Sequence, residues 1–164
     1  MIENTYPVVV NLLTDMLKRI IVLEKTLQDE AKVLKTASSP DSISQKAGEK
    51  MRLVADLEAF NKQLVEVLRL ENLPIDRIGI GQYFKNVGAA GLNMIALESD
   101  WQKIQENALL CKQLNDQNGA SILLLSRHTE RALQIVKGST LVSNTYGPNG
   151  ASQSELHSRS LFSV

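Results

Sequence analysis

Few side chains in this sequence could do chemistry, and they are scattered along the chain. There is one cysteine, Cys111, and there are two histidines, His128 and His157. Cys111 falls among regularly spaced apolar residues, which indicates a small core residue rather than a nucleophile. Two isolated histidines do not make up the ligand set of a zinc site. Since no nucleophile, base and orienting group can be placed together, we expect no enzyme, no cofactor and no metal centre.

A glycine pair, Gly79 and Gly81, is the nearest approach to a nucleotide-binding motif. The dinucleotide fingerprint needs a third glycine, at the position where Phe84 stands, and a strand before the first glycine. No alternation typical of a strand precedes Gly79. The pair therefore predicts a connector and no nucleotide site.

Composition narrows the class of protein further. A chain of 164 residues is most often one domain. Its 18 basic and 18 acidic side chains cancel, and it has no basic run, so we expect no nucleic-acid partner. A single cysteine cannot form an internal disulfide and suits the reducing cytoplasm. No apolar run approaches the ~20 residues that cross a bilayer, so no stable membrane insertion is expected.

Three stretches carry apolar residues at helical spacing, and these elements must position everything else. They cover about residues 5–37, 42–72 and 92–137, and the last begins at Leu92 or at Ser99. Their apolar residues recur in steps of three and four, which is typical of helices that pack along a seam. In the first stretch the predicted seam is Val9, Leu13, Met16, Ile20, Leu23, Leu27, Ala31 and Leu34.

Local signals predict where these helices begin and end. Ser42, with Gln45 three residues later, predicts a capping box that opens the second helix. The helix ends before Pro74, because the residue before a proline avoids the helical conformation. From Pro74 to Gly91 we expect a connector with at most a turn or two of helix. The sequence therefore predicts an all-α fold, an elongated antiparallel three-helix bundle over residues 1–137 with a flexible tail over residues 138–164.

Asn115 and Asn118 are the unusual residues of the last helix. Counting in steps of three and four from Leu97 places both amides on its apolar seam, and Gly119 follows directly. A buried amide in a helical seam fixes register or partner choice at some cost in stability. Two interpretations stay open: a register lock, or a polar break where the helices open for a partner.

The predicted tail is too polar to form a core, yet apolar residues recur in it. Ser152 with Glu155 forms a capping-box pattern, and a helix from there would be too short to be stable alone in water. Such a segment is suited to folding onto a partner, and the alternative is a frayed terminus without a role. Its predicted binding residues are Leu141, Val142, Leu156, Leu161 and Phe162.

Four runs of sequence, in this order, carry a resemblance to a known family: LEKTLQDEAKVLK, EKMRLVADLEAFNKQL, LNDQNG and TYGPNG. The first two resemble the first two helices of FlgN-type flagellar export chaperones. LNDQNG is similar to the centre of that family's last helix, and TYGPNG to the small aromatic-glycine motif after it. The resemblance covers nearly the whole chain.

This resemblance implies a cytoplasmic chaperone that holds the hook-associated proteins of the hook–filament junction before type III export. In that family the C-terminal region binds a helical segment at the end of the cargo, and the chaperone passes the cargo to the export gate. The resemblance also suggests that Tyr146, in TYGPNG, helps to dock the loaded chaperone at the export machinery. No cofactor is implied. The alternative is a generic helical adaptor or coiled-coil scaffold with a different protein partner.

Overall fold

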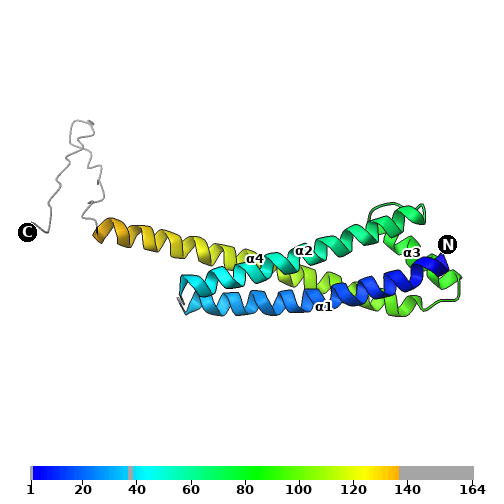
Figure 1. Cartoon of the computed structure of the whole chain (residues 1–164), viewed down its shortest axis with the longest axis horizontal. Helices are drawn as coiled ribbons and strands as arrows, with labels where there is room; N and C mark the ends of the chain where they lie inside the picture. Colours follow the sequence, from blue (N-terminus) through cyan, green and yellow to red (C-terminus); the bar gives the residue numbers. More distant parts are fainter. Residues whose placement is uncertain (1, 37–38, 137–164) are drawn as a thin grey trace, which may run out of the picture. The chain divides into compact units, whose positions relative to one another are not determined.

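In the computed structural model of the chain, residues 2–36 and 39–136 are described. They form four helices, α1 (Ile2–Lys35), α2 (Pro40–Leu70), α3 (Arg77–Ala89) and α4 (Met94–Val136) (Figure 1). No strand occurs in this part of the chain. The prediction of an all-α helical bundle is confirmed, with one helix more than was expected.

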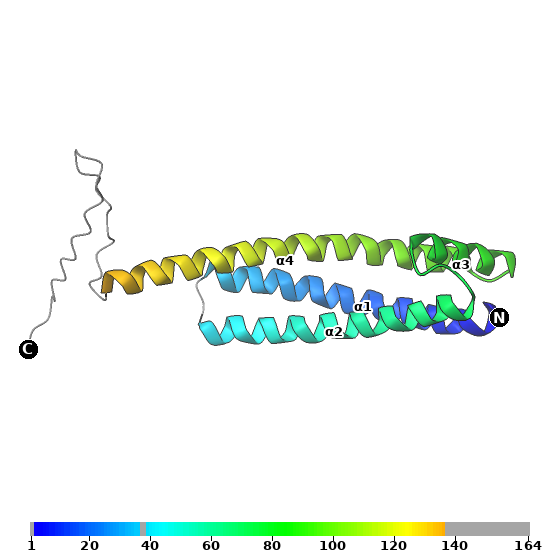
Figure 2. The ribbon, with the colours of Figure 1, turned by 90° about the horizontal axis from the view of Figure 1, so that it is seen from above.

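The chain divides into two compact units, Met1–Gly119 and Ala120–Val164. The first unit holds α1, α2, α3 and α4 as far as Gly119. In it, α1 and α2 lie side by side (Figure 2). Lys50 of α2 pairs with Glu30 near the end of α1, whereas Glu71, just after α2, accepts a hydrogen bond from Thr5 near the start of α1. These two helices are therefore antiparallel.

The first part of α4 runs in the same direction as α1. Cys111 lies beside the carbonyl oxygen of Ile20, and Asn118 donates a hydrogen bond to that of Leu27. Both contacts join residues 91 positions apart, so α4 is parallel to α1 and in a constant register. The order is that of an up-down-up bundle, with α3 in the second connection.

The seam of α1 supplies much of the core. Every predicted seam residue except Ala31 is buried, and each such side chain contributes about 1.5–3 kcal/mol by leaving water. Ala31 is only half-buried, and Glu30 is buried in its place. The core is completed by Leu53, Leu64, Val67 and Leu68 of α2, Tyr83, Phe84 and Val87 of α3, and Leu97, Ile104 and Cys111 of α4.

The start of α2 differs from the prediction. The helix begins at Pro40, and Ser39 is its N-cap, whose Oγ accepts a hydrogen bond from the N–H of Ser42. The expected cap at Ser42 is therefore wrong. Proline has no N–H to leave unpaired, and its ring fixes the helical φ, so it favours the first helical position over a place in a turn.

The connector before α4 contains a full helix of 13 residues, α3, rather than a turn or two. Asp76 caps it, since its Oδ1 accepts a hydrogen bond from the N–H of Gly79 at 2.9 Å. Tyr83, Phe84 and Val87 lie at helical spacing and are buried. Packing of these three side chains stabilises a glycine-containing segment that would not be helical alone.

Left-handed residues close the helices on either side of this connector. Asn72 (φ 56°) follows α2 and Gly91 (φ 74°) follows α3. After each of these two residues, the N–H of the following residue donates a hydrogen bond to the carbonyl oxygen five residues before it, at 2.9 and 3.1 Å. These bonds supply partners for carbonyl groups at the helix ends. Helix α4 then begins at Met94, between the two predicted starts, because Asn93 accepts a hydrogen bond from the N–H of Ala96.

Gly79→Ala is expected to lower the free energy of unfolding by about 1–3 kcal/mol. A Cβ atom at residue 79 would lie 1.8 Å from the carbonyl oxygen of Pro74, so the turn before α3 would have to move. Gly81 is the matched control, because nothing lies within 4 Å of a Cβ there, and Gly81→Ala should stabilise the helix slightly. Urea titration compares the two variants, and equal stabilities would contradict the predicted clash.

Candidate functional site

Three polar side chains from three helices meet inside the first unit. They are Glu30 of α1, Lys50 of α2 and Asn118 of α4, and we call them the polar layer. The exposed fractions of Glu30 and Asn118 are 1% and 2%, and that of the Lys50 side chain is 23%. Each occupies a position that an apolar seam residue would otherwise take.

The geometry of the polar layer satisfies its buried carboxylate. Lys50 Nζ donates to both carboxylate oxygens of Glu30, at 3.0 and 3.2 Å. Asn118 Nδ2 donates to Glu30 Oε2 at 2.8 Å and to the carbonyl oxygen of Leu27 at 2.9 Å. A buried charge with this many partners is tolerated, whereas the same charge without them would be very costly. The full set of hydrogen bonds to Glu30 therefore forms only when α1, α2 and α4 are all in place.

The two predicted seam asparagines differ in the structure. Asn118 is buried and hydrogen-bonded, but Asn115 is exposed. The expectation that both amides lie on the seam is therefore wrong for Asn115. The seam passes from Cys111 to Leu114 and then to Asn118, and Leu114 packs against the core.

Glu30 and Lys50 were missed because the prediction followed residue type. The seam of α1 steps 4, 3, 4, 3 and 4 from Val9 to Leu27, and strict alternation would continue to residue 30. Ala31 was chosen since it is apolar. Lys50 likewise lies seven residues before Leu57, which is the signal that could have placed it on the seam of α2.

A second group of polar contacts lies at the opposite end of the same bundle. The hydroxyl of Tyr83 donates to Thr5 Oγ1 at 3.2 Å, and Thr5 donates to Glu71 Oε1 at 2.7 Å. Burial raises the pKa of the Tyr83 hydroxyl, which keeps it protonated and able to donate. The chain of bonds holds α3 to α1 and to the end of α2.

The residues that could have supported catalysis are in ordinary surroundings. Cys111 is buried, and burial raises the pKa of its thiol to about 11, so it stays protonated at neutral pH. The prediction that it is a core residue is confirmed. His128 is exposed, and His157 lies outside the described residues. Nowhere in residues 2–36 and 39–136 do three His, Cys, Asp or Glu side chains gather as a metal ion would need.

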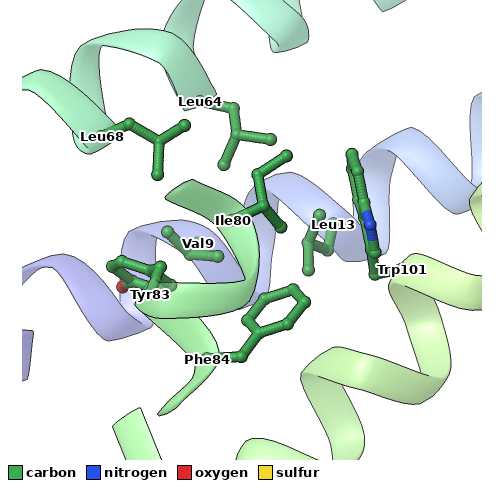
Figure 3. Close-up of a pocket in the computed structure, with 8 residues that line it drawn as sticks. All are labelled: Val9, Leu13, Leu64, Leu68, Ile80, Tyr83, Phe84 and Trp101. Carbon is green, nitrogen blue, oxygen red and sulfur yellow. The ribbon is translucent and has the colours of Figure 1, made fainter. Parts of the chain in front are cut away.

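A small cavity lies where all four helices meet (Figure 3). Its volume of about 10 Å³ is at the lower limit for one water molecule. A gap of this size with an apolar lining is a packing void in the core and holds no ligand. Its lining is Val9, Leu13, Leu64, Leu68, Ile80, Tyr83, Phe84 and Trp101.

The described part of the second unit, residues 120–136, is a single stretch of helix. Six of its large apolar side chains are exposed, from 41% at Ile122 to 83% at Val136, whereas Leu125 is half-buried. The predicted tail residues Leu141, Val142, Tyr146, Leu156, Leu161 and Phe162 lie outside the described residues.

The family model of the FlgN protein matches residues 1–154 of the chain. The chain belongs to the FlgN family. This is a family of flagellar export chaperones, so the resemblance inferred from LNDQNG and TYGPNG is confirmed. Among the curated proteins and the solved structures, none matches the chain. Across the parts of this FlgN family member that the structure describes, no helix combines the length and apolar character that a bilayer crossing requires.

Proposed function

We propose that the chain is a cytoplasmic export chaperone that binds the C-terminal helical segment of a hook-associated junction protein and delivers it to the type III export gate. Membership of the FlgN family supports this function. The structural observation that carries it is the exposed apolar end of α4, because a surface of that kind is suited to receive another helix.

The apolar end of α4 has the spacing of a packing surface. Ile122, Leu125, Thr129, Ala132 and Val136 follow in steps of 3, 4, 3 and 4, the same repeat that α4 uses in the core of the first unit. Ile122 and Val136 of this stripe are 41% and 83% exposed, and Leu133, next to Ala132, is 51% exposed. A helix of the cargo that buried this stripe would gain about 25 cal/mol for each Å² of apolar surface removed from water.

The tail is the second part of the proposed site. Leu141 and Val142 lie within the residues that the family model matches, whereas Leu156, Leu161 and Phe162 lie wholly beyond residue 154. We propose that all five side chains contact the cargo helix. Ordering about a dozen tail residues costs on the order of 1–2 kcal/mol each for the backbone, so these contacts must bury apolar surface.

Leu161→Asp combined with Phe162→Asp is expected to weaken cargo binding by about 100-fold, which corresponds to about 2.7 kcal/mol. The two carboxylates would replace apolar contacts and would be desolvated in the complex. Calorimetry with the isolated C-terminal segment of a hook-associated protein measures the effect. Circular dichroism and thermal melting should match the parent, since the helical core lies before the tail.

The matched control is Ser160→Asp with Ser163→Asp, which adds the same charge without removing apolar side chains. It should bind nearly as tightly as the parent. Undiminished affinity of the Leu161 and Phe162 variant would instead place the cargo on the helices. Leu133→Asp with Val136→Asp then tests the end of α4 directly.

Tyr146→Ala is expected to leave cargo affinity unchanged and to lower export of the junction proteins. The proposal assigns this residue to docking at the export gate, a step after cargo binding. Secretion assays in a flagellated strain carrying the variant, together with calorimetry, separate the two steps. Tyr6→Phe is a control on another tyrosine, and export at the parental level by Tyr146→Ala would remove the assigned role.

A further inference from the structure

The apolar seam between α1 and α4 does not by itself determine their register. Ile20 lies beside Cys111, and Leu27, seven residues on, lies beside Asn118. Sliding α4 by one heptad would bring Cys111 opposite Leu27, and apolar side chains would still face each other along most of the seam. Heptad repeats with purely apolar seams commonly allow such alternatives.

The polar layer favours one of these alternative registers of α4 over the others. Glu30 is 1% exposed, and its carboxylate needs both the ammonium group of Lys50 and the amide of Asn118. In a register shifted by one heptad, the amide of Asn118 would no longer reach Glu30. The carboxylate would then be buried with an incomplete set of partners, which is strongly unfavourable.

The same argument applies to a helix from another molecule. An amphipathic helix that displaced α4 would bring an apolar side chain to the place of Asn118, and one that displaced α2 would remove Lys50. In either case Glu30 would lose hydrogen bonds that it makes at 2.8 to 3.2 Å. Such a penalty on wrong partners is how buried polar residues produce specificity.

We propose that the polar layer is a selectivity lock, which makes α1 accept only an α2 that carries Lys50 and an α4 that carries Asn118, in one register. The excluded arrangements are an α4 in a shifted register and amphipathic helices that lack these two residues, such as those of export cargo. The part that concerns cargo rests on the proposed function, whereas the part that concerns the register does not. The lock keeps an internal apolar seam closed in a molecule that also exposes an apolar stripe on α4.

The register can be measured with the chain's own cysteine. Cys111 Sγ lies 3.8 Å from the carbonyl oxygen of Ile20, and both side chains are buried in the same core, so Ile20→Cys places a second thiol in that layer of the core. Mild oxidation of that full-length variant should give one intramolecular disulfide. Adding Glu30→Leu, Lys50→Leu and Asn118→Leu should reduce the intramolecular yield severalfold, because α4 could then also lie in shifted registers, although helix content and melting temperature are kept or raised.

The matched control removes an exposed ion pair between α1 and α2, Arg19 and Asp56, which are 3.4 Å apart. Arg19→Leu with Asp56→Leu should leave the intramolecular yield unchanged. If the triple-leucine chain fails to fold, Glu30→Leu with Asn118→Leu gives the same readout, because Lys50 is partly exposed. An unchanged intramolecular yield in a folded leucine variant would overturn the proposal.

A second measurement tests exclusion of foreign helices. The probe is a fluorescent peptide of residues 94–119 that carries Asn118→Leu, and the readout is anisotropy. The parent chain should not bind it, whereas the triple-leucine chain should bind it measurably. Equal binding by the two chains, or binding by neither, would contradict the lock. Because no cargo is present in either experiment, failure of the proposed chaperone function would leave both results unaffected.

Discussion

Lys50→Met is expected to lower the free energy of unfolding by about 3–5 kcal/mol. The substitution removes the cation that pairs with Glu30 and leaves a carboxylate that is 1% exposed with only the amide of Asn118 as a partner. Methionine is close to lysine in length and is flexible, so loss of packing contributes little. Urea titration followed by circular dichroism measures the change.

Two further variants isolate the unpaired charge as the cause. Lys50→Met combined with Glu30→Leu removes both charges and should return the stability to within about 1 kcal/mol of the parent, because replacing a whole buried pair is often neutral. Lys46 lies one turn earlier on α2 and pairs with Glu49 of the same helix. Lys46→Met removes this cation and should change the free energy of unfolding little. A small effect of Lys50→Met alone would mean that water solvates Glu30.

The helices themselves were predictable because periodicity is a property of the sequence. Steps of three and four placed Val9 to Leu27 on one face of α1, and these side chains are buried. The helix ends were less predictable, since several residues can form the same cap. Ser42 had a suitable partner three residues later, but Pro40 at the first helical position decided in favour of Ser39.

The polar layer could be predicted only in part. Asn118 was noticed because an amide among apolar residues is unusual, whereas Glu30 and Lys50 were not noticed because charged residues are normally on the surface. The prediction replaced Glu30 by Ala31, and it kept Asn115 where the seam uses Leu114. In both places residue type was followed instead of position. Which three polar residues meet depends on the register of three helices, and local periodicity does not contain that information.

Helix α3 was underestimated for a related reason. Gly79, Gly81 and Gly88 lower its helix propensity, so a local analysis favours a loop. Tyr83, Phe84 and Val87 supply the compensating energy, but only by packing against helices that are distant in sequence. Tertiary contacts of this kind override local propensity, and a sequence analysis without contacts cannot weigh them.

Phe84→Ala is therefore expected to lower the free energy of unfolding by about 3–5 kcal/mol. The ring is 5% exposed, lies edge-on to Tyr83 with the ring centroids 6.4 Å apart, and lines the cavity of about 10 Å³. Its removal would enlarge that void among side chains of four helices, and the cost of such a substitution grows with the cavity left behind. Urea titration measures the global loss.

The loss should also have a local signature. A helix of 13 residues is not stable alone in water, so α3 should lose protection from hydrogen exchange before α1 and α2 do. Lys85→Ala is the matched control, since it shortens the exposed neighbouring side chain on the same helix and should change stability little. A cost below about 1 kcal/mol for Phe84→Ala would show that the bundle closes around the missing ring, because the measured cost depends on how well the site collapses. Tyr83 and Val87 would then be sufficient to hold α3 in place.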